Sequence, residues 1–250
     1  MLDIKDAKIA IPVVLVAGLF WSFGPYVVRH IDGAEQVPWQ YLFTRGIVIF
    51  TILNIFLYLE EGKDFIKNYM KIGISGIVGG IGLGIAMISF IYSITNTSAA
   101  VTLLCLAAMP FITALLGFMF LREEISTNVW VAIAIAAIGI LIMAIDNSGK
   151  NTILGFVFGI ISSIGFSVFS VSLRWRKDTP KFTTVAIAGI FCAVFSAMMI
   201  LFNDLSFLSS GKNHALFATH GTLVCLGMIL YTIESKNIPA AELTLLSLTE

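Results

Sequence analysis

The segment Gly18–Gly24, with the sequence GLFWSFG, recurs in altered form at Gly159–Gly165 as GIISSIG, 141 residues later. Glycine, serine and glycine occupy the same relative positions in both segments, and each segment lies inside a long apolar run. Related segments at a fixed spacing indicate an internal repeat. The spacing of this repeat therefore predicts how the rest of the chain divides into two copies.

Three further pairs of segments match in the same order at offsets of 139 to 142 residues: Ile49-Phe50 with Ile190-Phe191, Ile91–Ile94 with Leu230–Ile233, and Thr102–Leu106 with Thr244–Leu248. Because all the matches share nearly one offset, we interpret the chain as a duplicated unit. The first copy is predicted over residues 1–146. The second is predicted over residues 147–250, where it stops before it is complete.

The composition indicates a protein that is surrounded by lipid. Hydrophobic residues make up 58% of the chain and charged residues only 12%, against about 25% charged in soluble domains. The formal net charge is zero, which gives no basic field for binding nucleic acid. The cysteines lack metal-ligand spacing and lie in apolar runs, so we predict packing roles and neither a metal nor another cofactor; they are Cys105, Cys192 and Cys225.

A membrane-spanning helix needs about 20 mostly apolar residues. The predicted spans are 9–28, 39–59, 72–94, 97–121, 127–145, 153–173, 182–202 and 214–235, with a ninth that begins near Ile238 and is cut off at Glu250. The predicted fold class is therefore an all-α integral membrane bundle. Pro110 lies inside the fourth span and should kink it, which leaves backbone carbonyls in need of another partner.

An odd number of spans in the first copy forces the second copy to enter the membrane from the opposite side. The predicted architecture is two inverted five-helix repeats, with ten spans expected and eight plus part of a ninth present. Inverted repeats are typical of secondary transporters, whose substrate site lies near the midplane between the copies. An old duplication kept only for packing is the alternative. The missing end predicts a chain that is truncated at its C-terminus.

The distribution of basic residues predicts the orientation, because cytoplasmic segments carry the excess of lysine and arginine. With the N-terminus in the cytoplasm, eleven basic residues lie inside and three lie outside. The predicted location is the cell inner membrane, crossed many times. The three outside are Arg29, Lys150 and Lys212.

Several motifs together resemble the EamA-like permeases of the drug/metabolite transporter superfamily. They are the G-x-x-W-S-x-G-P stretch Gly18–Pro25, Arg45 in the second span, the A-A-x-x-x-L-L-x-x-x-x-P run Ala99–Pro110, the L-R-E-E segment Leu121–Glu124, and the A-A-x-x-x-L-L pattern again at Ala240–Leu246. The resemblance implies ten helices in two inverted halves with both termini in the cytoplasm. It also implies gradient-driven movement of small organic metabolites, often as export.

Arg45 is the sharpest candidate for substrate binding. A charge inside a span is costly and usually faces the bundle interior or a wet cavity. The aligned position in the second copy is Ala186, so symmetric packing does not require the charge. A guanidinium there could bind a substrate carboxylate or phosphate. The alternative is that the side chain snorkels to the outer interface.

Three aromatic residues are further candidates for the substrate site: Trp21, Tyr92 and Tyr231. They lie at positions that the repeat relates, and their rings could form a cavity wall; the alternative, which the sequence favours, is core packing.

Glu250 and Glu242 are the candidates for ion coupling, because a carboxylate near mid-membrane can exchange a proton during transport. Glu242, like Glu234, is also compatible with an interfacial position. His220 lies deep enough in its span to act as a proton relay.

The predicted function is a secondary transporter of small organic metabolites that works by alternating access and is coupled to a gradient. The alternative is a non-transporting membrane protein or an inactive truncated remnant. An enzyme is not expected, since the sequence contains no H-x-x-x-H motif, paired aspartates or nucleophile–base pair. The predicted partners are a small-molecule substrate and the lipid bilayer, and a homodimer is also compatible with the sequence.

Overall fold

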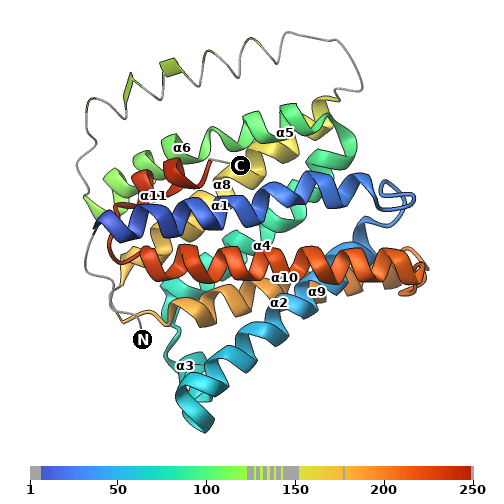
Figure 1. Cartoon of the computed structure of the whole chain (residues 1–250), viewed down its shortest axis with the longest axis horizontal. Helices are drawn as coiled ribbons and strands as arrows, with labels where there is room; N and C mark the ends of the chain where they lie inside the picture. Colours follow the sequence, from blue (N-terminus) through green and yellow to red (C-terminus); the bar gives the residue numbers. More distant parts are fainter. Residues whose placement is uncertain are drawn as a thin grey trace.

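The computed structural model of the chain describes residues 7–122, 152–176 and 178–248, with single positions between 127 and 142. All regular structure in these residues is helical (Figure 1). The α-helices are α1 (Ala7–Arg29), α2 (Pro38–Glu61), α3 (Ile66–Lys71), α4 (Gly73–Asn96), α5 (Ala99–Leu106), α6 (Met109–Leu116), α8 (Ile153–Trp175), α9 (Lys181–Phe202), α10 (Gly211–Glu234) and α11 (Ala240–Ser247). A 3₁₀ turn (Gly62–Phe65) precedes α3, and a π-helical turn (Gly117–Leu121) follows α6.

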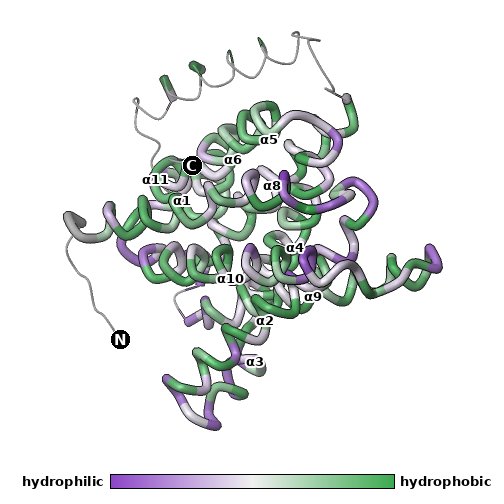
Figure 2. Tube along the Cα trace, turned by 45° about the vertical axis from the view of Figure 1, so that its right-hand side comes forward, coloured by the Kyte–Doolittle hydropathy of each residue, from purple (hydrophilic) through white to green (hydrophobic). Residues whose placement is uncertain are grey.

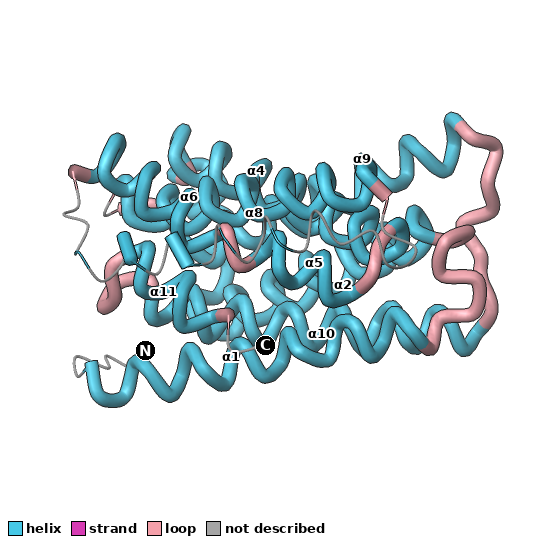
Figure 3. Tube along the Cα trace, turned by 90° about the horizontal axis from the view of Figure 1, so that it is seen from above, coloured by secondary structure: helices cyan, strands magenta, loops and turns pink. Residues whose placement is uncertain are grey.

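The long helices identify a multi-pass membrane protein. Within the described residues, 7 helical segments are long and apolar enough to cross a bilayer. Figure 3 shows them side by side, with most loops at the two ends of the bundle. Most of the predicted fifth span, 127–145, lies outside the described residues. The larger predicted number of spans therefore stays a prediction.

The fourth predicted span is broken, where the sequence led us to expect one kinked helix. α5 ends and α6 begins on either side of a two-residue turn, and Pro110 occupies the second position of α6. Proline cannot donate a hydrogen bond to the preceding turn. Two other backbone carbonyls beside the break accept hydrogen bonds from α8. Ser163 Oγ donates to Cys105 O at 2.6 Å, and Ser167 Oγ donates to Met109 O at 3.1 Å.

The outer surface of the bundle is apolar, and many hydroxyl groups are buried inside. Figure 2 shows hydrophobic residues along the helices, with hydrophilic residues mainly in the loops and at helix ends. Large apolar side chains are exposed along the helices, for example Leu19, Ile55, Ile77, Val157, Phe195 and Leu226. Such a surface is unfavourable in water and suits a lipid environment. Many of the buried serine and threonine hydroxyls form hydrogen bonds, several of them between helices, as is usual in membrane bundles.

The helices pack in a pattern that relates two halves of the chain. α4 packs along α8 as α1 packs along α10, and α4 contacts α9 as α10 contacts α2. The contact of α5 with α8 likewise corresponds to the contact of α11 with α1. One further contact, α2 with α9, joins corresponding helices. Exchanging α1, α2, α4 and α5 with α8, α9, α10 and α11 thus leaves these main contacts unchanged.

Glycine allows α2 and α9 to touch through their backbones. A Cβ added to Gly46 would lie 2.6 Å from the carbonyl oxygen of Gly189, and a Cβ on Gly189 would lie 3.0 Å from the oxygen of Gly46. Each glycine is the ninth residue of its helix. Small residues permit this close approach in membrane bundles. The two helices therefore cross at equivalent points.

Candidate functional site

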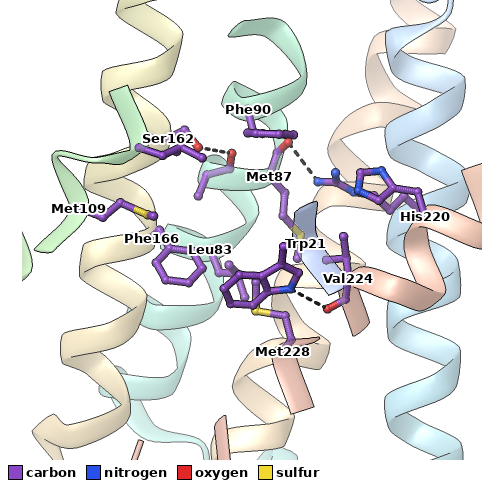
Figure 4. Close-up of a pocket in the computed structure, with 13 residues that line it drawn as sticks. Trp21, Leu83, Met87, Phe90, Met109, Ser162, Phe166, His220, Val224 and Met228 are labelled. Atoms are coloured by element: carbon purple, nitrogen blue, oxygen red, sulfur yellow. Dashed lines mark hydrogen bonds between the residues drawn. The ribbon is translucent and has the colours of Figure 1, made fainter. Parts of the chain in front are cut away.

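A cavity of about 90 Å³ lies at the centre of the bundle (Figure 4). Its walls come from α1, α2, α4, α8 and α10 and from both parts of the broken fourth span. The lining residues are Trp21, Arg45, Leu83, Ala86, Met87, Phe90, Leu106, Met109, Ser162, Phe166, His220, Val224 and Met228. The cavity is mostly apolar, with polar groups at a few points. Ligand-binding cavities are commonly lined in this way, although most are larger, at about 300–1,000 Å³.

Arg45 is the one permanently charged side chain in this lining. It lies in the third turn of α2, which starts at Pro38, where the missing N–H of proline has no consequence. The guanidinium is only 2% exposed and donates from Nη2 to Met87 O at 3.1 Å, while Nε has no hydrogen-bond partner. The snorkelling alternative is therefore wrong. The side chain lines the central cavity, about 10 Å along the helix from its N-terminal end.

The buried charge of Arg45 has no acidic partner in the part of the chain that the structure describes. Among the described residues, no carboxylate forms an ion pair with Arg45. Its Cζ lies 5.6 Å from the centre of the Tyr41 ring, a cation–π contact that offsets part of the cost of burial. Burying a charge at membrane depth costs about 3 kcal/mol or more. This cost, with no acidic partner among the described residues, favours a role in binding a ligand.

Trp21 and Tyr231 lie together, but only Trp21 lines the cavity. Trp21 Nε1 donates to Val224 O at 3.4 Å, and its ring packs edge-on against Phe166 at 5.7 Å. Tyr231 is fully buried behind it, with ring centres 5.6 Å apart, and its hydroxyl is hydrogen-bonded to Ser170 Oγ at 2.7 Å. Tyr231 therefore supports the cavity wall and does not line it.

Two further sequence candidates, Tyr92 and Glu242, do not line the cavity. Tyr92 packs between Trp39 and Phe158, with ring centres 5.0 and 5.3 Å away. Glu242 is exposed in the first turn of α11, and Glu250 lies outside the described residues.

Glu234, which we expected at an interface, is instead fully buried at the end of α10. Its Oε2 accepts a hydrogen bond from Asn237 Nδ2 at 3.0 Å.

His220, which lies on α10, lines the cavity. It is 2% exposed, and its Nδ1 is hydrogen-bonded to the hydroxyl of Tyr41. The ring fits against α1 because residue 24 is glycine, where a Cβ would lie 3.0 Å from Nε2. The sequence identified the histidine by its depth alone. Tyr41 has no sequence signal of its own, because its partners come from distant segments.

The methionines in the cavity wall were not predicted. Met87, Met109 and Met228 line it from α4, α6 and α10. In a membrane bundle both lipid-facing and core-facing positions are apolar, so hydropathy does not distinguish them. Flexible thioether side chains suit a cavity that adapts to its ligand.

A second and larger cavity of about 980 Å³ lies near α3, between the C-terminal halves of α2 and α10 and the N-terminal end of α9. It shares no lining residue with the central cavity. Its charged lining residues are Glu60, Glu61, Lys71, Asp178, Lys181 and Lys236. Among the described residues, no group of three His, Cys, Asp or Glu could hold a metal ion.

Comparisons with known proteins find one family model, several related proteins and a solved structure that resemble this chain. The sequence model of the EamA-like transporter family matches residues 8–145. Two proteins of Helicobacter pylori, from strains J99 and 26695, are each described as an uncharacterized transporter. Each is 25% identical to this chain over 92% of its length and 78% of the relative. A chain of known crystal structure superposes with a TM-score of 0.68 at 18% identity, over 97% of this chain and 84% of that chain. This last likeness shows the fold alone.

Proposed function

Because this chain belongs to the EamA-like transporter family, we propose that it is a secondary transporter that moves small organic metabolites across the cytoplasmic membrane by alternating access. The observation that carries the proposal is Arg45, a buried cation with no acidic partner in the wall of the central cavity. Substrate sites of secondary transporters lie near the midplane between repeats. The anionic group of a substrate would supply the missing partner of Arg45.

The packing pattern supports two inverted repeats that could exchange roles between inward-facing and outward-facing states. Corresponding helices make corresponding contacts, and α2 meets α9 at Gly46 and Gly189, the ninth residue of each. This register pairs Arg45 with Ala188, where the sequence alignment had suggested Ala186. Either pairing leaves the charge in one repeat only. A charge that symmetry does not require favours a role in function over one in packing.

The proposed transport is tested by reconstituting the full chain into liposomes and imposing a pH gradient or a membrane potential. We expect gradient-driven uptake of at least one member of a panel of small carboxylates, amines and neutral metabolites, at several times the rate of protein-free liposomes. The chain would then be active as a transporter without a partner. If no gradient drives uptake of any member, the remaining interpretation is a non-transporting membrane protein.

The proposed cytoplasmic N-terminus predicts which loops face outward. Leu208, between α9 and α10, should lie outside, and Met70, in α3, should lie inside. Both are highly exposed, and the native cysteines are buried. A membrane-impermeant maleimide should therefore label Leu208→Cys in intact cells and Met70→Cys only after permeabilisation. The reverse pattern would show that the N-terminus lies outside.

A further inference from the structure

Three residues form a connected group at one side of the central cavity. Tyr41 and Arg45 lie one turn apart on α2, so their side chains share a face of the helix. His220 comes from α10, and its ring stacks on Tyr41 with centres 5.7 Å apart and an interplanar angle of 19°. The Tyr41 hydroxyl is hydrogen-bonded to His220 Nδ1. All three side chains are 2% exposed, and Arg45 and His220 both line the cavity.

The surroundings of His220 contain cationic charge and no described acid. α2 contributes Arg45 and the neutral Tyr41, while the parts of α1 and α4 at the cavity contribute only uncharged groups: Trp21, Gly24, Met87 and Phe90. α9 adds the thiol of Cys192, which donates to Leu42 O at 3.6 Å. No ion pair in the described chain involves His220 or Arg45. The field that acts on the imidazole therefore comes mainly from Arg45.

This arrangement makes the charge state of His220 depend on what occupies the cavity. In the empty cavity, a proton on the imidazole would place a second positive charge beside Arg45 in a medium of low dielectric constant, which is unfavourable. An anion between the two residues would attract both charges. Anion and proton would then each increase the affinity of the cavity for the other, because linkage between two ligands is reciprocal.

We propose that the central cavity binds a small organic monoanion together with one proton, with the anion on Arg45 and the proton on His220. The apolar part of the anion packs against Trp21, Phe166 and Met228, which line the same cavity. When His220 gains the proton, its Nδ1–H donates to the Tyr41 oxygen, and the tyrosine hydroxyl turns its hydrogen away. Tyr41 thus positions the ring in both states.

This inference rests on the proposed transport function and adds a substrate class and a coupling ion to it. A monoanion and a proton bound together carry no net charge into the cavity. Their joint passage would be driven by a pH gradient and would be insensitive to membrane potential. A site for cations would need acidic groups, and the described cavity lining has none.

The inference is tested by calorimetry on the purified full chain, with matched acids and amides as probes. The acids are propionate, benzoate and indole-3-acetate, and the amides are propionamide, benzamide and indole-3-acetamide. We expect at least one acid to bind at least tenfold more tightly than its amide. Titration in buffers of different ionisation enthalpy should show uptake of one proton per bound acid above neutral pH. The affinity should then fall about tenfold per pH unit as the pH rises.

His220→Gln should remove the proton uptake and the pH dependence of acid binding. His30→Gln is the matched control, because His30 is exposed at the end of α1, and it should bind as the unmodified chain does. Tyr41→Phe keeps the aromatic ring and should retain the proton uptake with a shifted pH profile. This variant tests the inference if His220→Gln fails to fold.

Three results would overturn the inference: amides that bind as tightly as acids, acids that bind to the unmodified chain without proton uptake, or proton uptake that persists in a folded His220→Gln. None of these would remove the transporter proposal. Liposomes that accumulate amines or neutral solutes but no carboxylate would leave transport intact and exclude the anion–proton site. Liposomes that accumulate nothing would count against the transport function itself.

Discussion

Arg45→Ala is expected to abolish gradient-driven transport while the protein still inserts into the membrane and remains folded. The guanidinium is buried in the cavity wall, and in the empty cavity it makes one hydrogen bond, to a backbone carbonyl. Truncating one partner of a buried charge pair costs about 2–5 kcal/mol, which corresponds to a loss of affinity for an anionic substrate of about thirtyfold or more. The measurement is the initial rate of substrate uptake into liposomes that contain equal amounts of folded protein.

Two further substitutions separate binding from folding. Arg45→Lys keeps the charge but loses the planar fork of donors, so we expect partial activity. Arg29→Ala removes an exposed arginine at the end of α1 and should leave transport unchanged. Removing a buried charge that has no acidic partner should not lower stability, because its desolvation cost is removed as well. Unchanged uptake by Arg45→Ala would exclude Arg45 from the substrate site.

Gly46→Leu is expected to disrupt the bundle. The Cβ of any other residue at position 46 would lie 2.6 Å from the backbone carbonyl oxygen of Gly189, a contact that no rotamer change can relieve because the backbone fixes the position of Cβ. Overpacking of this kind costs about 1–3 kcal/mol and occasionally more. Because the leucine side chain is long, we expect the cost of this substitution to lie at the upper end of that range. We expect a lower melting temperature in detergent and loss of the single monodisperse peak in gel filtration.

Gly211→Leu is the matched control for this packing prediction. Gly211 is the first residue of α10, and a Cβ there would have no heavy atom within 4 Å. The same change of residue therefore adds a side chain in open space. An equal loss of stability in both variants would show that the contact of α2 with α9 does not hold the bundle together.

The membrane fold could be predicted from the sequence because its main determinant is local. Long apolar runs identify spanning helices one at a time, since each must satisfy its own backbone hydrogen bonds in lipid. The break in the fourth span is also local, because it follows from the missing N–H of Pro110. Arg45 stood out in the same way, as a charge within an apolar run that lipid makes costly.

The arrangement of the cavity could not be predicted, because it depends on which helices pack together and how each is rotated. Trp21, Tyr92 and Tyr231 were equivalent candidates in the sequence. In the structure Trp21 lines the cavity, Tyr231 lies behind Trp21, and Tyr92 packs against Trp39 away from the cavity. In a soluble protein the buried face of a helix can be recognised from the periodicity of its apolar residues, whereas a helix in lipid is apolar on both faces.

The sequence by itself therefore determined that this chain crosses a membrane several times and that Arg45 is an exceptional charge. Only the tertiary structure decided that Tyr41 and His220 meet Arg45 beside one cavity, because α2 and α10 are more than 140 residues apart in the chain. The chemistry of the cavity arises from this contact between distant segments, which no local pattern of residues records.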